Sequence, residues 1–147
     1  MGPNLGTGDV LMMHVCRIMA PHFEYAEMIE MHREGKADAP SGTAVSTARA
    51  MLEARDNKSF EHNVAQRETV AGTRGGDLGG VAIHSVRSPG VVGVHEVLFG
   101  GPGESLTVRH DSLTRESFTP GVILAVRTVM KERRYIYGLE SLLGLAG

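Results

Sequence analysis

The pattern of apolar and polar positions predicts an alternation of helices and strands along the 147 residues. One helix is predicted after Thr7, a candidate N-cap; its apolar positions run from Val10 to Met19, and Pro21 ends it. They cover more than one stripe, so we expect this helix to be buried on more than one side. A second helix is predicted from Pro120 to about Glu132, with proline at the first helical position.

The strands are predicted from dense or alternating apolar residues. The first runs from Tyr25 to Met31. Three more candidates, Val81 to Arg87, Val91 to Phe99 and Ser105 to His110, follow one another across turns rich in glycine and proline. This spacing is typical of an antiparallel meander.

The segment before these three strands is less regular. Val64 to Val70 could form a short strand. Arg74 to Gly80 is glycine-rich, but no helical pattern follows it, so a mobile loop is a better interpretation than a phosphate loop.

The strand from Val91 to Phe99 is largely apolar on both faces. One face can pack on helices, but a chain of this length has too few helices to cover the other. We therefore predict an α+β fold, with a mixed or antiparallel open sheet packed against helices on one face. The other face is expected to meet a sheet of another subunit.

Composition fits one modest domain, with 41% hydrophobic residues and a formal net charge of -2, which gives no electrostatic case for nucleic-acid binding. No apolar run could span a bilayer, and the N-terminus lacks signal-peptide features. The single cysteine, Cys16, can form no internal disulfide, which fits a reducing compartment. We expect a cytoplasmic protein without a nucleic-acid or membrane partner. One cysteine and no His-Glu-x-x-His spacing also argue against a metal site.

Candidate chemistry gathers where the first strand gives way to a helix predicted over residues 44–55. Ser41, Gly42 and Thr43 form the turn into this helix. A helix start exposes backbone N–H groups and the positive end of the helix dipole, so the turn could hold a carboxylate or a phosphate. Ser41 or Thr43 could equally be no more than the N-cap.

Two titratable side chains precede this turn. His32 stands at the end of the strand, and an imidazole titrates near neutral pH. Lys36 could donate a proton readily if a partly dry pocket lowers its pKa. Arg33 and Lys36 together would attract a dianion. A solvated charged loop would explain Arg33 and Lys36 without any function, so both interpretations stay open.

Glu30, His32, Lys36 and the unbroken run Asp38-Ala39-Pro40-Ser41-Gly42-Thr43-Ala44 resemble the signature of the dihydrodipicolinate reductases (4-hydroxy-tetrahydrodipicolinate reductases), nicotinamide-dependent enzymes of the diaminopimelate route to lysine. The similarity extends to Gly2-Pro3-Asn4-Leu5, Val91 to Phe99 and Arg109-His110-Asp111-Ser112. No strand-glycine-helix unit for a dinucleotide is present. The resemblance thus covers the C-terminal part of the family. We expect residues 1–147 to form a substrate-binding and oligomerisation domain without the dinucleotide-binding domain.

The resemblance implies that NADH or NADPH reduces a small cyclic dicarboxylate, with His32 as the acid/base group and Lys36 as a proton donor. The substrate carboxylates would meet the N–H groups of Gly42 and Thr43, with Ser41 nearby. Gly2, Pro3, Asn4 and Leu5 would pass under the nicotinamide ring, with Leu5 where the family commonly has phenylalanine. The resemblance also implies a homotetramer that packs sheet against sheet.

Arg33 is a departure from the family, which commonly has a second histidine at this position that contacts substrate. The guanidinium of Arg33 could grip a carboxylate in its place. Two other classes stay open: a non-catalytic oligomeric module that binds dicarboxylates, and a hydrolase using Ser41, His32 and Asp38. The hydrolase is disfavoured because Ser41 lacks a Gly-x-Ser-x-Gly elbow.

Overall fold

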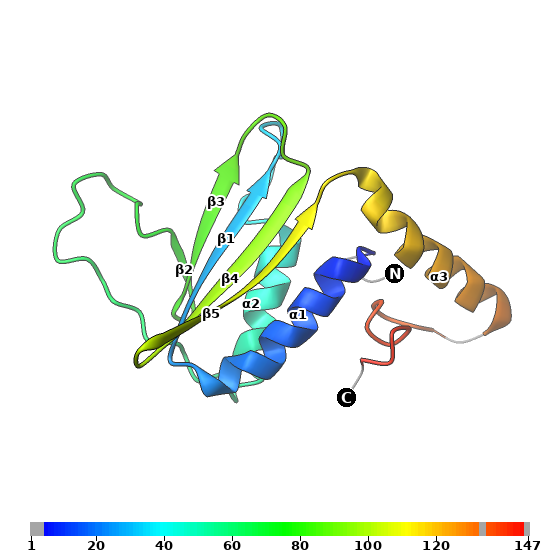
Figure 1. Ribbon diagram of the computed structural model, residues 1–147, viewed down its shortest axis with the longest axis horizontal. Coiled ribbons are helices and arrows are strands. Elements are labelled where there is room, and N and C mark those ends of the chain that lie inside the picture. Colours follow the sequence, from blue (N-terminus) through cyan, green and yellow to red (C-terminus); the bar gives the residue numbers. More distant parts are fainter. Residues whose placement is uncertain (1–4, 133–134, 146–147) are drawn as a thin grey trace.

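The structure is a computed structural model, and it describes residues 5–132 and 135–145. The helices are α1 (Thr7–Met19), α2 (Gly42–Glu53) and α3 (Thr119–Lys131), with short 3-10 turns at Ala20–His22 and Arg115–Phe118; the strands are β1 (Tyr25–His32), β2 (Gly76–Leu78), β3 (Val81–Arg87), β4 (Gly93–Gly101) and β5 (Glu104–Ser112). Together they form a mixed open sheet with α1 and α2 on one face (Figure 1). The predicted α+β class is confirmed.

The strand order is β2-β3-β1-β4-β5. β1 runs parallel to β3, whereas its pairing with β4 and the pairings β2–β3 and β4–β5 are antiparallel. The predicted meander is therefore wrong for β3 and β4, because β1 lies between them. Residues 33–80 form a crossover connection long enough for β3 to return parallel to β1.

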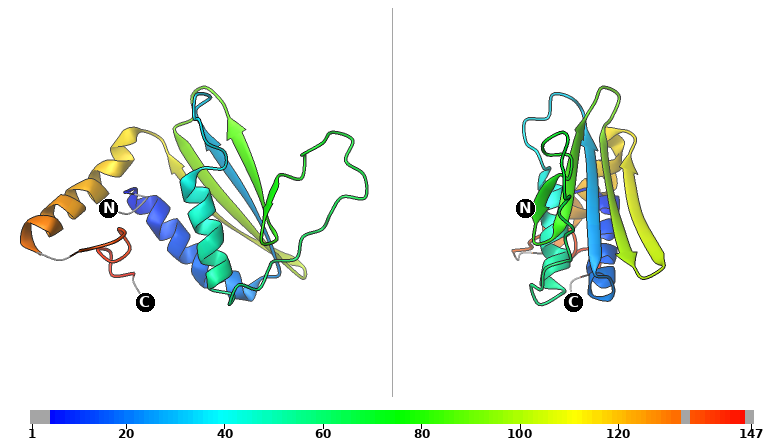
Figure 2. Two further views of the ribbon diagram at one scale, coloured as in Figure 1. Left: turned by 180° about the vertical axis from the view of Figure 1, so that it is seen from behind. Right: turned by 90° about the vertical axis from the view of Figure 1, so that its left-hand side faces the viewer.

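The core lies between the sheet and the pair α1 and α2, which Figure 2 shows on the same face. Alternate residues of β1 and β4 point into it, and Met28 lies opposite Val97 while Ala26 lies opposite Phe99. Cys16 of α1 is also fully buried there, and burial raises the pKa of its thiol to about 12. The helix α1 is thus held firmly against the sheet.

Several local predictions need correction. Thr7 is the first residue of α1 and not its cap; Gly6 takes the cap position without a side-chain hydrogen bond. Residues 64–70 form no strand, since this exposed segment projects beyond the β2 edge of the sheet (Figure 1). The segment Arg74 to Gly80 is not simply a loop, because β2 within it pairs with β3.

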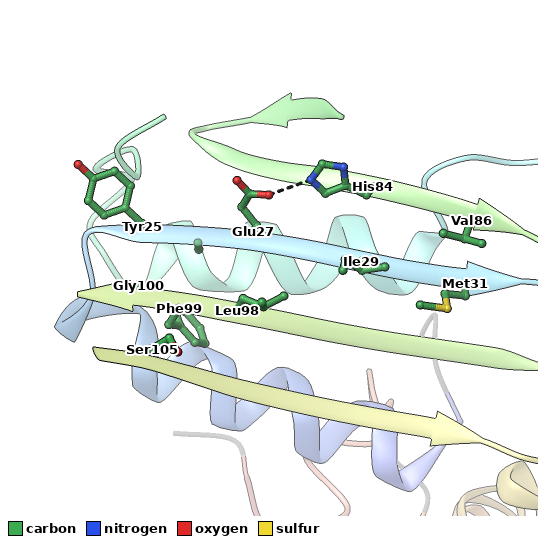
Figure 3. Close-up of a pocket in the computed structure, with 11 residues that line it drawn as sticks. Tyr25, Glu27, Ile29, Met31, His84, Val86, Leu98, Phe99, Gly100 and Ser105 are labelled. Carbon is green, nitrogen blue, oxygen red and sulfur yellow. Dashed lines mark hydrogen bonds and ion pairs between the residues drawn. The ribbon is translucent and has the colours of Figure 1, made fainter. Parts of the chain in front are cut away.

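The second face of the sheet carries apolar side chains that no helix of residues 5–132 covers. Tyr25, Ile29, Met31 and Leu98 line a shallow hollow of about 630 Å³ on this outer face (Figure 3). Glu27 and His84 form an ion pair at its rim, with 2.9 Å between the imidazole Nε2 and a carboxylate oxygen. An apolar surface of this kind is unusual on a protein that stays monomeric.

α3 extends away from the sheet (Figure 1). The segment 135–145 returns along it and buries Leu139, which is 2% exposed. Leu5, Val126 and Val129 line a hollow of about 270 Å³ between them. No helix in the described part of the chain is long and apolar enough to cross a membrane.

Candidate functional site

The carboxyl ends of the parallel strands β1 and β3 bring two polar side chains together. His32 and Arg87 are partners in the strand register. Both contact Glu30: His32 Nδ1 lies 2.5 Å from one carboxylate oxygen, and Arg87 Nη2 donates to the other at 2.7 Å. Arg87 Nη2 also donates to the carbonyl oxygen of Asp38 at 2.7 Å. The loop after β1 is thereby fixed to the end of β3.

Glu30 is completely buried. Burial opposes its ionisation, but the hydrogen bonds it accepts, the strongest from Arg87, hold its pKa below the ordinary value. Burial also lowers the pKa of His32; the Glu30 carboxylate opposes this, while the neighbouring side chains of His95 and Lys36 lower the pKa further. A neutral His32 can act either as a proton acceptor or, after protonation, as an acid.

The turn into α2 follows as predicted. Ser41 is the N-cap, and its Oγ accepts a hydrogen bond from the Ala44 N–H at 3.1 Å. Gly42 is exposed, and a Cβ at this position would meet nothing within 4 Å, so the space beside the first turn of α2 is open. The capping interpretation of Ser41 is confirmed, and the open turn still leaves room for an anion.

The charged residues of the loop after β1 make few contacts with the rest of the site. Lys36 Nζ lies 2.5 Å from a carboxylate oxygen of Asp38, which is exposed. Within residues 5–132 and 135–145, the exposed guanidinium of Arg33 forms no ion pair. Lys36 is close enough to His32 to lower the pKa of the imidazole. Their catalytic and binding roles stay predictions.

A buried histidine that the sequence analysis missed joins the strand end to the turn. The ring of His95 on β4 lies edge-on to His32, with 5.3 Å between the ring centroids. Its Nε2 lies 3.0 Å from Ser41 Oγ. His95 is 3% exposed. The alternation of apolar residues in its strand placed it on the face of Val97 and Phe99, and this was the only signal for it.

Behind His95 lies the carboxylate of Asp9 in the first turn of α1. Asp9 Oδ1 is 3.2 Å from His95 Nδ1 and 2.9 Å from His110 Nδ1. His110 can approach so closely because its neighbour in α1 is Gly8, where a Cβ would lie 2.3 Å from His110 Nε2. Nothing in the sequence pattern of α1 pointed to Asp9.

Among residues 5–132 and 135–145, two groups of three side chains each have three metal-ligand atoms within 4.8 Å of one another: Asp9, His95 and His110, and Glu30, His32 and His95. Contacts of Asp9 with His95 and His110 account for the first group, and the contact of Glu30 with His32, against which the His95 ring packs, accounts for the second. The hydrolase set is not assembled, because Ser41 contacts His95 and not His32, while Asp38 pairs with Lys36.

The predicted nicotinamide segment is described only in part. Gly2, Pro3 and Asn4 lie outside the described residues. Leu5 is half-buried beside α3. Its role toward a cofactor stays a prediction.

Nearly the whole chain is similar to known proteins, and the matches agree on one family. The family model described as "Dihydrodipicolinate reductase, C-terminus" matches residues 8–143. The chain is 51% identical over 141 residues to the 4-hydroxy-tetrahydrodipicolinate reductase of Geobacillus thermodenitrificans, covering 96% of this chain and 53% of that protein. It is 51% identical over 145 residues to that of Mycolicibacterium gilvum, covering 98% and 58%.

The fold agrees as well. The structure of a dipicolinate-bound dihydrodipicolinate reductase from Paenisporosarcina sp. TG-14 superimposes with a TM-score of 0.83 at 44% identity, covering 95% of this chain and 52% of that one. The chain spans about half the length of the curated relatives it matches. It belongs to the dihydrodipicolinate reductase family, of which it matches the C-terminal domain.

Proposed function

We propose that the chain is the substrate-binding domain of a 4-hydroxy-tetrahydrodipicolinate reductase and binds a small cyclic dicarboxylate where β1 gives way to α2. One observation carries this proposal: His32 and the open turn at Ser41 meet around the same buried ring of His95. The dipicolinate bound in the reductase of similar structure supports the ligand class. The reaction would be an NADH- or NADPH-dependent reduction in the diaminopimelate route to lysine.

The carboxylates of the ligand are bound at the helix start. The N–H groups of Gly42 and Thr43 belong to the first turn of α2, where the helix dipole favours an anion. Arg33 has an exposed guanidinium that can bind a carboxylate with two parallel hydrogen bonds. Two separate anion contacts suit a ligand that carries two carboxylates.

Proton transfer is assigned to the last residue of β1 and to a lysine in the loop that follows it. His32 directs Nδ1 toward Glu30, which leaves Nε2 for exchange of a proton with the ligand. Lys36 delivers a proton to the position that becomes negative when hydride arrives. NADH or NADPH supplies the hydride when bound, and Leu5 offers an apolar contact to the nicotinamide ring.

The outer face of the sheet is assigned to assembly. We infer that the same face of another copy covers the hollow lined by Ile29, Met31 and Leu98, in a homotetramer. Burying these side chains removes apolar surface from water. The rim pair of Glu27 and His84 gives the contact a polar border.

A second candidate is a non-catalytic oligomeric module that binds dicarboxylates. The open space beside Gly42 supports it, because this turn can bind an anion without any transfer of hydride. In this alternative the chain binds the dicarboxylate and does not oxidise NADH.

Isothermal titration with pyridine-2,6-dicarboxylate tests the binding function. We expect binding by the unaltered chain, and a loss of about tenfold in affinity for His32→Ala and for Lys36→Ala. His22→Ala and Lys58→Ala, which alter exposed residues away from the turn, should bind as the unaltered chain does. Absence of binding would contradict the proposal. Binding without oxidation of NADH would favour the module.

A further inference from the structure

A row of polar side chains crosses the helix-covered face of the sheet behind the Ser41 turn. In the strand register, His95 on β4 lies opposite Glu30 on β1 and opposite His110 on β5. Polar groups in such a core are costly to bury without partners. The burial of Glu30 is explained by its contacts with His32 and Arg87. The burial of His95 needs a separate explanation.

His95 contacts two buried partners from different elements, one with each ring nitrogen. Nε2 lies 3.0 Å from Ser41 Oγ, within hydrogen-bond geometry, and Nδ1 lies 3.2 Å from Asp9 Oδ1, a close contact that does not meet hydrogen-bond geometry. Ser41 is 2% exposed and Asp9 is 5% exposed. Around this line of three, Glu30 and His32 face the His95 ring from β1, and His110 approaches through Asp9 from β5.

The hydrogen positions follow from Asp9. Burial opposes ionisation of Asp9, but its close contacts with His95 and His110 hold its pKa below the ordinary value, and the N-terminal turn of α1 favours a negative charge. An ionised carboxylate only accepts hydrogen bonds. A neutral His95 therefore carries its proton on Nδ1, and its Nε2 is left as an acceptor. Ser41 then donates its hydroxyl proton to His95.

We propose that His95, oriented by Asp9, is a positioning residue that fixes the Ser41 hydroxyl and thereby holds the anion-binding turn at the start of α2. The proposal rests on the proposed function, because it names what holds the dicarboxylate turn in its binding geometry. Ser41 Oγ accepts from the Ala44 N–H while its own proton goes to His95. Both hydrogen bonds are in place before a ligand arrives, so less conformational entropy is lost on binding.

One consequence concerns what the ligand meets. With its proton directed at His95, the Ser41 hydroxyl has no donor left for a carboxylate. The ligand is held by backbone N–H groups of the turn, and Ser41 acts from behind them.

The order of serine, imidazole and carboxylate is also that of a serine hydrolase triad. However, Ser41 is buried and its Oγ serves as the helix cap. The hydroxyl is therefore not free to attack a substrate. An acylating ester probe should leave Ser41 unmodified, and labelling of Ser41 would overturn its positioning by His95.

The protonation of His95 can be measured directly. At about pH 8, where an ordinary histidine is neutral, ¹⁵N NMR of the imidazole should show Nδ1 protonated and Nε2 bare. Asp9→Asn should reduce this tautomer, as expected when the orienting carboxylate becomes an amide. A spectrum of the unaltered chain with the proton on Nε2, or on both nitrogens, would overturn the proposal. This measurement needs no ligand.

Binding of pyridine-2,6-dicarboxylate gives the second arm. His95→Phe removes the acceptor for Ser41, and we expect the dissociation constant to rise about tenfold, the size of one lost buried hydrogen bond. His95→Gln offers an amide oxygen to the same hydroxyl and should recover most of this loss. His22→Gln, at an exposed position, is the matched control. Unfolding midpoints of all variants show whether a change reflects loss of the fold.

The outcomes separate the two proposals. If the unaltered chain binds the dicarboxylate and His95→Phe binds it equally well, the positioning role is wrong and the proposed function stands. If His95→Gln is no better than His95→Phe, the hydrogen bond to Ser41 is not what matters, and the proposal is overturned. If the unaltered chain fails to bind, the proposed function falls, and the binding role of His95 falls with it.

Discussion

The carboxylate of Glu30 is fully buried and accepts a hydrogen bond from Arg87 Nη2 at 2.7 Å. The same carboxylate contacts His32, the strand-register partner of Arg87. A single buried anion therefore ties together the ends of two parallel strands, at the point where the chain turns toward α2. The geometry of the candidate site depends on this contact.

Replacement of Glu30 should be strongly destabilising. Glu30→Ala leaves Arg87 and His32 without their shared partner, and loss of one member of a buried ion pair costs about 3–5 kcal/mol of unfolding free energy. Urea denaturation followed by circular dichroism measures this. Glu53→Ala, at an exposed position of α2, should change the value by less than about 0.5 kcal/mol. A loss for Glu30→Ala no larger than in this control would contradict the interpretation.

Acid should destabilise the domain in two stages. The pKa of His32 is lowered by burial in the folded state, so below about pH 6.5 the unfolded state takes up this proton first and the free energy of unfolding falls. The pKa values of Asp9 and Glu30 are also lowered. Their contribution is present above about pH 4 and is lost as the pH falls through their folded-state values.

Urea midpoints measured at a series of pH values test this order. We expect the free energy of unfolding to decrease on going from neutral pH toward pH 5, and to decrease further below pH 4, each approximate limit being set by the ordinary pKa values of histidine and the carboxylic acids. His32→Gln should flatten the first stage and leave the second. An increase in stability between neutral pH and pH 5 would contradict the prediction.

Gly42→Ala should separate folding from binding. A Cβ at Gly42 meets nothing within 4 Å, so the substitution is compatible with the fold and stabilises it by about 0.4–1 kcal/mol through the unfolded state. The same methyl group occupies the open space beside the first turn of α2. We expect the affinity for pyridine-2,6-dicarboxylate to fall about tenfold.

The matched control is Gly76→Ala in β2, where a Cβ also meets nothing within 4 Å but lies away from the turn. This variant should bind as the unaltered chain does. Equal affinities for the two variants would show that the ligand does not lie against Gly42.

A charge placed on the outer face of the sheet should weaken the proposed contact between copies of the chain. Ile29→Lys places an ammonium in the hollow that Met31 and Leu98 share with it. We expect light scattering to show a smaller species with unchanged circular dichroism, because a charge buried in an apolar contact is costly. Val64→Lys, at a position that is 81% exposed, is the control. An unaltered chain that is already monomeric would refute the assignment.

Much of the fold followed from local pattern. The predicted bounds of β1 and α3 were close to those of the structure, because a clear pattern of apolar residues runs along each element. The local pattern could not predict which strands pair with β3. Whether consecutive strands pair with each other or with a third strand is decided by long-range packing, and β1 entered the sheet between β3 and β4.

The candidate site divides in the same manner. His32, Lys36 and the Ser41 turn lie within ten residues of one another in the sequence, between the end of β1 and the start of α2, so sequence proximity was enough to group them. Arg87, His95 and Asp9 come from three other elements, and only the strand register and the packing of α1 bring them to the loop. Nothing in the sequence around Ser41 or around His95 indicated that these two residues are in contact.

The contact between Asp9 and His110 joins residues 101 positions apart, and that between Ser41 and His95 joins residues 54 positions apart. No short stretch of the chain can assemble this cluster alone. A ligand held by the turn therefore recognises the folded domain and not the unfolded chain, and by mass action it must raise the melting temperature as its concentration increases. A thermal-shift titration with small diacids would thus survey ligands for this domain without any catalytic assay.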